Sequence, residues 1–245
     1  MTAVPLDPDI VPPPGWLLDE VANAGRENLD RGHVDGYDVK EDASAADEVL
    51  LCRRLGLTSH STVVDVGAGT GQFALAVAPA CARVVAVDVS PVMLRRLREK
   101  VAEAGATNIE VVQAGFLSYR HRGPPADLVY SRYALHHLPD LWKSVALVHL
   151  RRVLRPGGVL RLWDVVYSFG PAEAEERLEV WCASAGVSTR GDQGWSRAEL
   201  EEHVRDEHST FSWLLEPMIV RSGFDIEEVS YSDDGVFAKY VLRRT

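Results

Sequence analysis

Short apolar runs alternate with amphipathic segments along the middle of the chain. The runs are rich in valine and predict five strands, at residues 62–66, 83–87, 109–112, 127–131 and 159–163. The segments between them repeat apolar residues at helical spacing and predict helices at residues 71–79, 91–104 and 141–154. Near-continuous apolar strands that alternate with helices are typical of a parallel sheet covered on both faces, so the pattern predicts an α/β fold.

The two ends of the chain have different patterns. Residues 1–15 are rich in proline and predict an extended arm, because proline continues neither helix nor sheet. Residues 16–24 and 42–55 repeat apolar side chains at helical spacing and predict two N-terminal helices. At the other end, residues 224–231 and 236–242 predict two strands around a tight turn, which form an antiparallel pair at the edge of the sheet.

A helical insertion, residues 167–216, separates the fifth predicted strand from that terminal pair. Ser196 and Glu199 have the spacing of a capping box and predict the start of a helix that runs to about residue 206. Residues 211–221 predict a further helix, which Gly223 ends. The insertion is expected to form most of a lid, whose aromatic side chains either grip an acceptor or pack between helices, the commoner role.

The net charge and the cysteine content limit the partners and the cellular location that we expect for the protein. A net charge of −10 disfavours a nucleic-acid partner, since binding that polyanion usually needs a basic face. The three cysteines are far apart and have no zinc-binding spacing, which favours a reducing, cytoplasmic location. We expect no signal peptide and no membrane span, because no apolar run approaches about 20 residues.

A glycine-rich turn follows the first predicted strand. Gly67, Gly69 and Gly71 come at alternate positions, directly before a helical pattern. Strand, glycine turn and helix start are where α/β proteins hold a ligand. The spacing is not the G-x-G-x-x-G of dinucleotide sites, because Gln72 stands where the third glycine would be. No Gly-Lys-Ser/Thr follows, so the turn is not a phosphate-binding P-loop either.

Two acids flank this turn and give the predicted site a negative polarity. Asp65 lies near the end of the first strand, where its charge would repel a pyrophosphate and favour a cofactor with a cationic part. Asp88 ends the second strand, 21 residues after Gly67, where an acid accepts hydrogen bonds from both ribose hydroxyls. We therefore expect a cofactor that combines a ribose with a positively charged group.

Four motifs in order resemble those of the class I S-adenosylmethionine-dependent methyltransferases. They are residues 64–71, the acid Asp88, residues 126–131 with 134–138, and residues 150–158. The resemblance implies a Rossmann-like, doubly wound, mostly parallel seven-stranded sheet with an antiparallel C-terminal edge pair. It implies S-adenosylmethionine as cofactor and S-adenosylhomocysteine as product. The expected organisation is an arm and cofactor-covering segment, residues 1–41, followed by a methyltransferase domain with its lid, residues 42–245.

The resemblance also implies a set of cofactor contacts. Asp65 suits the positive amino and sulfonium groups, and Asp88 suits the ribose diol through charge-assisted hydrogen bonds. Val89 and Met93 are expected to pack on the adenine. The implied cofactor-binding residues are Tyr37, Asp65, Gly67, Ala68, Gly69, Gly71, Asp88, Val89, Met93, Ala114, Gly115, Phe116, Ser131 and Arg132.

Phe116 and Tyr37 each have a packing role as the alternative to cofactor binding, and the loop around Phe116 also departs from the family pattern. The family often has an acid after the third strand that meets the adenine amino group, but Ala114, Gly115 and Phe116 provide none. Phe116 either walls the adenine or is a plain core aromatic. Tyr37 either closes over the cofactor or packs as a hinge aromatic beneath the first helix.

Methyl transfer from a sulfonium is an in-line displacement, so alignment and exclusion of water matter most. His136 and His137 follow the fourth strand at the carboxyl edge of the sheet and are the candidate proton acceptors, with a structural role as the alternative. Asp164 either faces the acceptor or caps a helix. We expect no metal site, because His203 and His208 do not share a helix face and no cysteine is near.

The sequence thus favours transfer of a methyl group from S-adenosylmethionine to a small-molecule acceptor. A non-catalytic or regulatory S-adenosylmethionine-binding protein is one alternative. An NAD-dependent oxidoreductase on the same kind of sheet is another, which Gln72 and Asp65 disfavour.

Overall fold

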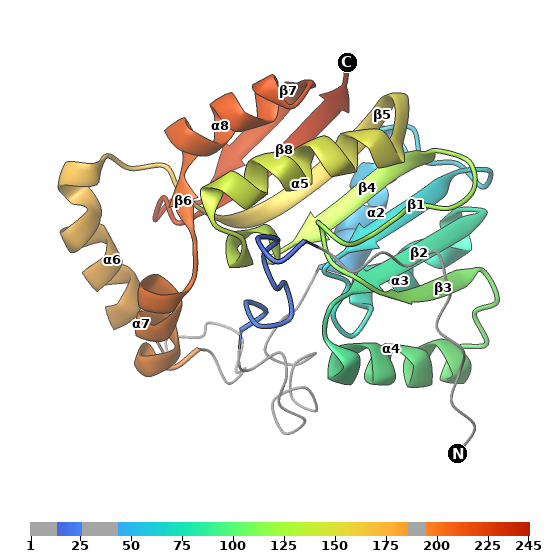
Figure 1. Cartoon of the computed structure of the whole chain (residues 1–245), viewed down its shortest axis with the longest axis horizontal. Coiled ribbons are helices and arrows are strands. Elements are labelled where there is room, and N and C mark those ends of the chain that lie inside the picture. The colour runs from blue at the N-terminus through green and yellow to red at the C-terminus, as the bar shows by residue number, and fades with distance from the viewer. Residues whose placement is uncertain (1–13, 26–43, 186–194) are drawn as a thin grey trace.

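A mixed sheet runs through the middle of the molecule (Figure 1). The computed structural model describes residues 14–25, 44–185 and 195–245. In order across the sheet, the strands are β3 (Ile109–Gln113), β2 (Arg83–Asp88), β1 (Thr62–Val66), β4 (Ala126–Arg132), β5 (Leu154–Tyr167), β8 (Phe237–Arg244) and β7 (Phe224–Tyr231).

The first five strands of the sheet are parallel, whereas β8 and β7 are antiparallel to their neighbours. The two-residue strand β6 (Thr210–Phe211) pairs with the end of β5. The predicted doubly wound sheet with an antiparallel C-terminal pair is confirmed. The strand order reverses between β1 and β4, so a crevice is expected outside their carboxyl ends.

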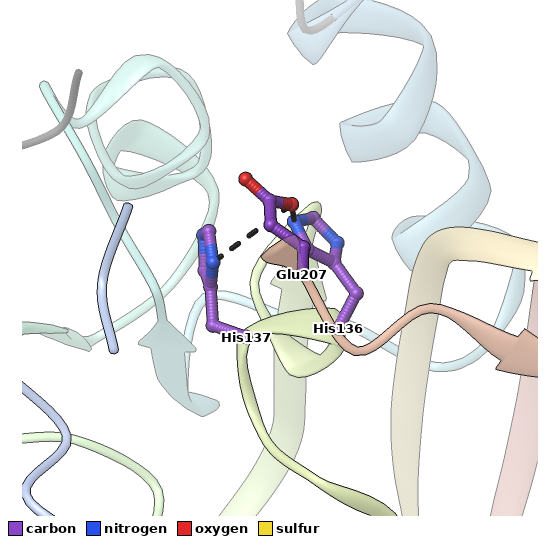
Figure 2. A group of neighbouring side chains, drawn as sticks. All are labelled: His136, His137 and Glu207. Atoms are coloured by element: carbon purple, nitrogen blue, oxygen red, sulfur yellow. Dashed lines mark ion pairs between the residues drawn. The ribbon is translucent and has the colours of Figure 1, made fainter. Parts of the chain in front are cut away.

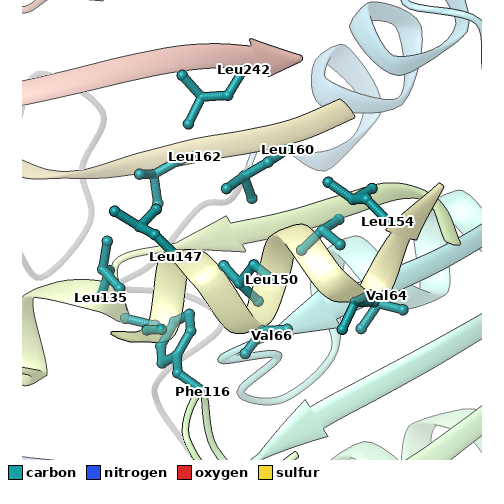
Figure 3. Packing of buried hydrophobic residues seen from close by; sticks show 14 of the residues in the cluster. Val64, Val66, Phe116, Leu135, Leu147, Leu150, Leu154, Leu160, Leu162 and Leu242 are labelled. Atoms are coloured by element: carbon teal, nitrogen blue, oxygen red, sulfur yellow. The ribbon is translucent and has the colours of Figure 1, made fainter. Parts of the chain in front are cut away.

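Helices cover both faces of the sheet (Figure 1). One face packs against α2 (Ala45–Arg54), α3 (Gln72–Val77) and α4 (Pro91–Glu103). The other packs against α5 (Asp140–Val153) and α8 (Ser212–Arg221). Figure 3 shows this second layer, where leucines of α5 meet Val64 and Val66 of β1. Burial on both faces explains why the strands are apolar throughout.

The predicted helix starts have the expected caps. Ser90 accepts a hydrogen bond from Met93 N at 3.2 Å, and Pro91 occupies the first turn of α4. The capping box of α7 (Arg197–Asp206) is complete, because Ser196 and Glu199 bond to each other's backbone amides at 3.3 and 2.7 Å.

The lid has a small core of its own. Its described helices are α6 (Ala174–Ala183) and α7, and a short 3₁₀ turn, η4 (Pro171–Glu173), precedes them. Trp181 and Leu200 pack with Tyr167 and Phe169 at the end of β5. These lid aromatics therefore serve helix packing, the commoner of the two roles expected for them.

Two local predictions were wrong. Residues 16–24 form successive turns, not a helix, because the Asp19 carboxylate accepts from Val21 N and Ala22 N at 3.0 and 3.2 Å. Such side-chain bonds offer the backbone an alternative to helix. Strand β5 begins at Leu154, five residues before its predicted start, because Leu154 pairs with Ala126 of β4 ahead of an irregularity in the register.

Two further 3₁₀ turns complete the described elements, η2 (Ala78–Ala80) and η3 (Leu135–His137). The first ends the helix predicted over residues 71–79, where Pro79 lies in the turn. The second follows β4 and carries the histidine pair. Among the helices in the described ranges, none is long and apolar enough to cross a membrane.

Candidate functional site

A cavity opens at the carboxyl ends of β1, β2, β3 and β4, where the strand order reverses. It brings together most of the residues that the sequence assigned to a cofactor, from three separate stretches of chain. The predicted residues in its wall are Gly67, Gly69, Asp88, Val89, Met93, Ala114, Gly115, Phe116 and His137. Glu20, Ala24, Val66, Tyr133, Ala134 and Leu138 complete the lining.

The glycine turn forms one wall of this cavity with its backbone. Gly67 N and Ala68 N donate to Val87 O at 2.9 and 3.0 Å, which ties the turn to β2. Gly67 has φ +76°, and a Cβ there would lie 2.3 Å from the Cβ of Ala134. Only glycine therefore allows the turn to approach the loop after β4 this closely. Gly71 does not line the cavity; it precedes α3 and packs against Leu97.

Asp88 lies at the end of β2 with its carboxylate fixed on both oxygens. Oδ2 accepts from Gly69 N and Oδ1 accepts from Ser90 N, each at 2.8 Å. Each carboxylate oxygen has a further lone-pair site, so both can still accept a bond from a ligand hydroxyl. Burial raises the pKa of this carboxyl. Hydrogen-bond donors from a ligand would offset that penalty by stabilising the charged form.

Asp65 lies beneath the glycine turn and is only 2% exposed. It lines a second hollow with Ala68 and Arg132, which shares Gly67, Gly69 and Tyr133 with the first cavity. Burial, and then the charge of Asp88, raise the pKa of Asp65 to about 8. A cationic ligand group nearby would favour the ionised carboxylate.

Near the end of β3 lies a carboxylate from a distant part of the chain, that of Glu20. Phe116 is buried and belongs to the core, and it also lines the cavity, so its two expected roles coexist. Beside it, the Glu20 carboxylate accepts from Leu117 N, Ser118 N and Ser118 Oγ at 2.9, 3.0 and 2.7 Å. Glu20 could not be predicted from the sequence, because its position 97 residues before Leu117 follows no motif spacing.

The loop after β4 joins the two hollows. Tyr133 lines both and has φ +49°, which is uncommon for a residue other than glycine. The Arg132 guanidinium lies over the rings of Tyr133 and Trp163, 4.4 and 4.6 Å from their centroids. Ser131 is fully buried and lines neither hollow. Tyr37 lies outside the described residues.

His136 and His137 have opposite environments. His136 Nδ1 is 2.5 Å from Asp164 Oδ1, and its Nε2 is 3.0 Å from Glu207 Oε2. Burial lowers the pKa of His136, but Asp164 and Glu207 more than offset it and raise the pKa to about 10. For His137, burial and the charge of His136 lower the pKa to about 3. His136 is thus enclosed between two carboxylates, whereas His137 lines the cavity.

The carboxyl of Glu207, directly after α7, was also missed by the sequence analysis. Burial raises its pKa, but His136 and His203 outweigh burial and hold the pKa below its ordinary value. Asp164 accepts from Leu135 N and His136 N at 2.8 and 3.2 Å, which supports the capping role expected for it. Only the contacts of the folded chain show that Glu207 lies beside the histidine pair.

Comparisons with known proteins agree with this geometry. The model of a family described as a methyltransferase domain matches residues 63–158. The 27-O-demethylrifamycin SV methyltransferase of Amycolatopsis mediterranei is 29% identical over 166 residues, which are 66% of this chain and 59% of that protein. The chain spans 59%, 63% and 49% of the length of three of the curated relatives it matches.

Solved structures share the fold at low sequence identity. The N-methyltransferase NodS of Bradyrhizobium japonicum, in complex with S-adenosyl-L-homocysteine, has a TM-score of 0.61 and 16% identity, covering 92% of this chain and 98% of its own. The [4+2]-cyclase SpnF has a TM-score of 0.62 and 17% identity, covering 83% and 81%. Residues 63–158 thus match a methyltransferase-domain family, and the described residues share the fold of solved S-adenosylmethionine-dependent methyltransferases.

The described residues of this methyltransferase fold fit the family's cofactor chemically. The Asp88 carboxylate keeps lone pairs that could accept bonds from a ribose, and the buried carboxyl of Asp65 would suit a cationic group. Between them the glycine turn leaves room along its backbone. No lysine or arginine in the described part of the chain lines the main cavity, so this cavity has none of the charge that a pyrophosphate would favour.

Proposed function

We propose that this chain transfers the methyl group of S-adenosylmethionine to a small-molecule acceptor. The observation that carries the proposal is the polarity of the two adjoining hollows, in which the buried Asp65 and the half-buried Asp88 flank a glycine turn at the switch point of the sheet. That polarity suits a ribose attached to a sulfonium and an ammonium group. It does not suit NAD, whose pyrophosphate is anionic.

S-adenosylmethionine would supply an activated methyl group on a positively charged sulfur. In the displacement, the acceptor's lone pair forms the new bond to the methyl carbon, and the electrons of the broken carbon–sulfur bond remain on sulfur. The protein's task is to align the acceptor with that bond and to exclude water. A lid that packs against the end of β5 is suited to this task.

We further propose the roles of the individual side chains. Asp88 accepts hydrogen bonds from the ribose hydroxyls, and Asp65 faces the charged methionine part. Val89, Met93 and Phe116 pack around the adenine, as their places in the cavity wall support.

Glu20 supplies the carboxylate that the loop after β3 lacks and meets the adenine amino group. Its place beside Gly115 supports this role: a Cβ on Gly115 would lie 2.3 Å from Glu20 Oε1. Both residues line the cavity. A segment far ahead of the motifs in sequence would thus complete the adenine pocket.

At the acceptor end, His137 is the member of the histidine pair that we propose meets the substrate. It lines the cavity, whereas His136 is held between two carboxylates and has no spare nitrogen for a proton. The net charge of −10 supports a small molecule over a nucleic acid as acceptor.

Two measurements test the proposal in order. Calorimetric titration with S-adenosylmethionine, S-adenosylhomocysteine and NAD asks which ligand the cavity takes, and the proposal fails if neither sulfur compound binds or if NAD binds more tightly. A screen of small hydroxyl, amine and carbon acceptors for release of S-adenosylhomocysteine then asks for transfer. Binding without release from any acceptor would favour a protein that holds the cofactor without transferring its methyl group.

A further inference from the structure

Three potential metal ligands meet where the lid touches the turn after β4. His136 and His137 of η3 and Glu207, which follows α7, each present one donor atom, and these atoms lie within 4.8 Å of one another (Figure 2). The two imidazole rings have centroids 4.4 Å apart. The cluster borders the cavity, because His137 is also part of the cavity wall.

The first ligand, His136, is oriented by a second carboxylate. Asp164 Oδ1 lies 2.5 Å from Nδ1 of His136, while Asp164 Oδ2 accepts from the backbone amides of Leu135 and His136. The ring is therefore fixed with Nε2 directed at Glu207. A carboxylate behind the far nitrogen of a histidine is the usual support of a metal-binding imidazole, because it fixes the tautomer and ring orientation.

The lid holds the third ligand in place from its own side. His208 N donates to His136 O at 2.9 Å, which anchors the chain directly after Glu207 on η3. His203 Nδ1 lies 2.6 Å from Glu207 Oε2, and its Nε2 is 2.8 Å from Ser209 Oγ. His203 thus acts as a positioning residue for the Glu207 carboxylate.

Two of the three atoms that could bind a metal ion lack a hydrogen bond. His137 Nδ1 and Glu207 Oε2 are buried, and neither has a hydrogen-bond partner among the residues that the structure describes. Oε2 lies 2.6 Å from His203 Nδ1, 3.0 Å from His136 Nε2 and 4.0 Å from His137 Nδ1, so three imidazoles surround this oxygen as ion-pair partners. Buried polar atoms are rarely left in this state unless water or an ion meets them.

We propose that His136 Nε2, His137 Nδ1 and Glu207 Oε2 bind one divalent transition-metal ion. Two imidazoles and one carboxylate are the ligand set of zinc sites that keep an open fourth position. Calcium and magnesium prefer oxygen ligands throughout, so the nitrogen donors favour zinc-type ions. The proposal departs from the sequence-based expectation of no metal, which considered His203 and His208 and could not include Glu207.

The site has a consequence for the acceptor that rests on the proposed methyl transfer. Since His137 lines the cavity, the open position of the ion would face the same space as the acceptor. An acceptor oxygen bound there would be oriented and made more acidic, which lowers the need for a protein base. The substrate class that fits is a small molecule with a hydroxyl or carboxyl oxygen at the methylated end.

The test uses the full chain, treated with a chelator and titrated with zinc chloride by calorimetry. We expect one equivalent of zinc to bind, and Glu207→Gln to weaken its affinity at least about tenfold, the scale seen when a supporting ligand is lost. Asp206→Asn is the matched control, because this neighbouring acid pairs with Arg205 on the surface and should leave zinc binding unchanged. Circular dichroism and thermal melting check that each variant is folded.

Cobalt chloride provides a second readout, since cobalt bound to nitrogen and oxygen ligands absorbs visible light and the free protein does not. The proposal is overturned if the folded wild-type protein takes up no zinc, or if Glu207→Gln binds zinc as tightly as the wild type. S-adenosylhomocysteine binding is measured separately without metal. Zinc binding without cofactor binding would refute the proposed function alone, and cofactor binding without zinc binding would refute the metal site alone.

Discussion

The buried carboxyl of Asp65 makes cofactor binding dependent on pH in a defined direction. In the free protein, burial and the charge of Asp88 raise its pKa to about 8, so the carboxyl is protonated at neutral pH. A sulfonium and an ammonium beside it favour the carboxylate and lower that pKa in the complex. Binding therefore releases a proton, and affinity rises with pH until it levels off above about pH 8.

The size of the effect follows from the same pKa. Below pH 8, each decrease of one pH unit weakens cofactor binding about tenfold, or 1.36 kcal/mol. This continues until the pH reaches the pKa that Asp65 has in the complex. Between pH 8.5 and pH 6.5 the fraction of ionised Asp65 falls about 25-fold, and the affinity for S-adenosylmethionine should fall by the same factor.

Calorimetric titrations at pH 6.5, 7.5 and 8.5, at constant ionic strength, measure this slope directly. Asp65→Asn is the matched control, because its amide has the same shape and does not titrate. The variant should bind more weakly, and its remaining pH dependence reports the ligand's own amino group together with Asp88, whose pKa burial also raises. An affinity of the wild type that stays flat over this range, or that falls as pH rises, would refute the role given to Asp65.

Three further predictions concern acids at other depths of the fold. Asp88→Ala should weaken S-adenosylhomocysteine binding by about 1.5–3 kcal/mol in calorimetry, the scale of a hydrogen bond to a charged group, and unchanged affinity in a folded variant would contradict the ribose assignment. Glu20→Ala should weaken the same binding roughly tenfold through loss of the adenine contact, and an effect on thermal stability without an effect on affinity would show that it only supports the loop. Glu48 forms a bidentate pair with Arg161 at 2.8 Å in the core, so Glu48→Gln should lower the free energy of unfolding in urea by about 3–5 kcal/mol. Glu99→Gln on the surface should change it by less than about 1 kcal/mol, and equal effects would contradict the burial argument.

The parts of the fold that the sequence predicted well depend on local patterns. Strand β1 has its predicted bounds, and α4 begins at its predicted cap, because apolar runs and capping residues act on neighbours in the chain. The errors arose where a distant or competing contact decides the backbone. Asp19 bonds prevent a helix over residues 16–24, and pairing with Ala126 extends β5 back to Leu154.

The same division applies to the candidate site. Asp65, Gly67 and Asp88 lie in one strand–turn–helix–strand stretch, so their spacing alone predicted that they meet. Glu20 and Glu207 come from opposite ends of the chain and reach the site only because turns and lid helices fold back over the sheet. No residue near either glutamate has a motif spacing, so sequence reasoning had no signal for them.

The site thus has one part built by a local stretch of chain and another built by distant segments, and this division bears on how the protein selects its reaction. The half of the site proposed for the cofactor is built by β1, β2 and the glycine turn, whose motif is shared with methyltransferases and whose fold is shared with a cyclase. The other half is built by η3, by the strained Tyr133 and by Glu207 from the lid. A backbone held at φ +49° persists only when surrounding contacts fix it, here the bond from Tyr133 N to Trp163 O at 2.9 Å and the Arg132 contact. The acceptor must therefore be sought through this second half, because a fold shared by methyltransferases and a cyclase does not by itself decide which reaction is performed.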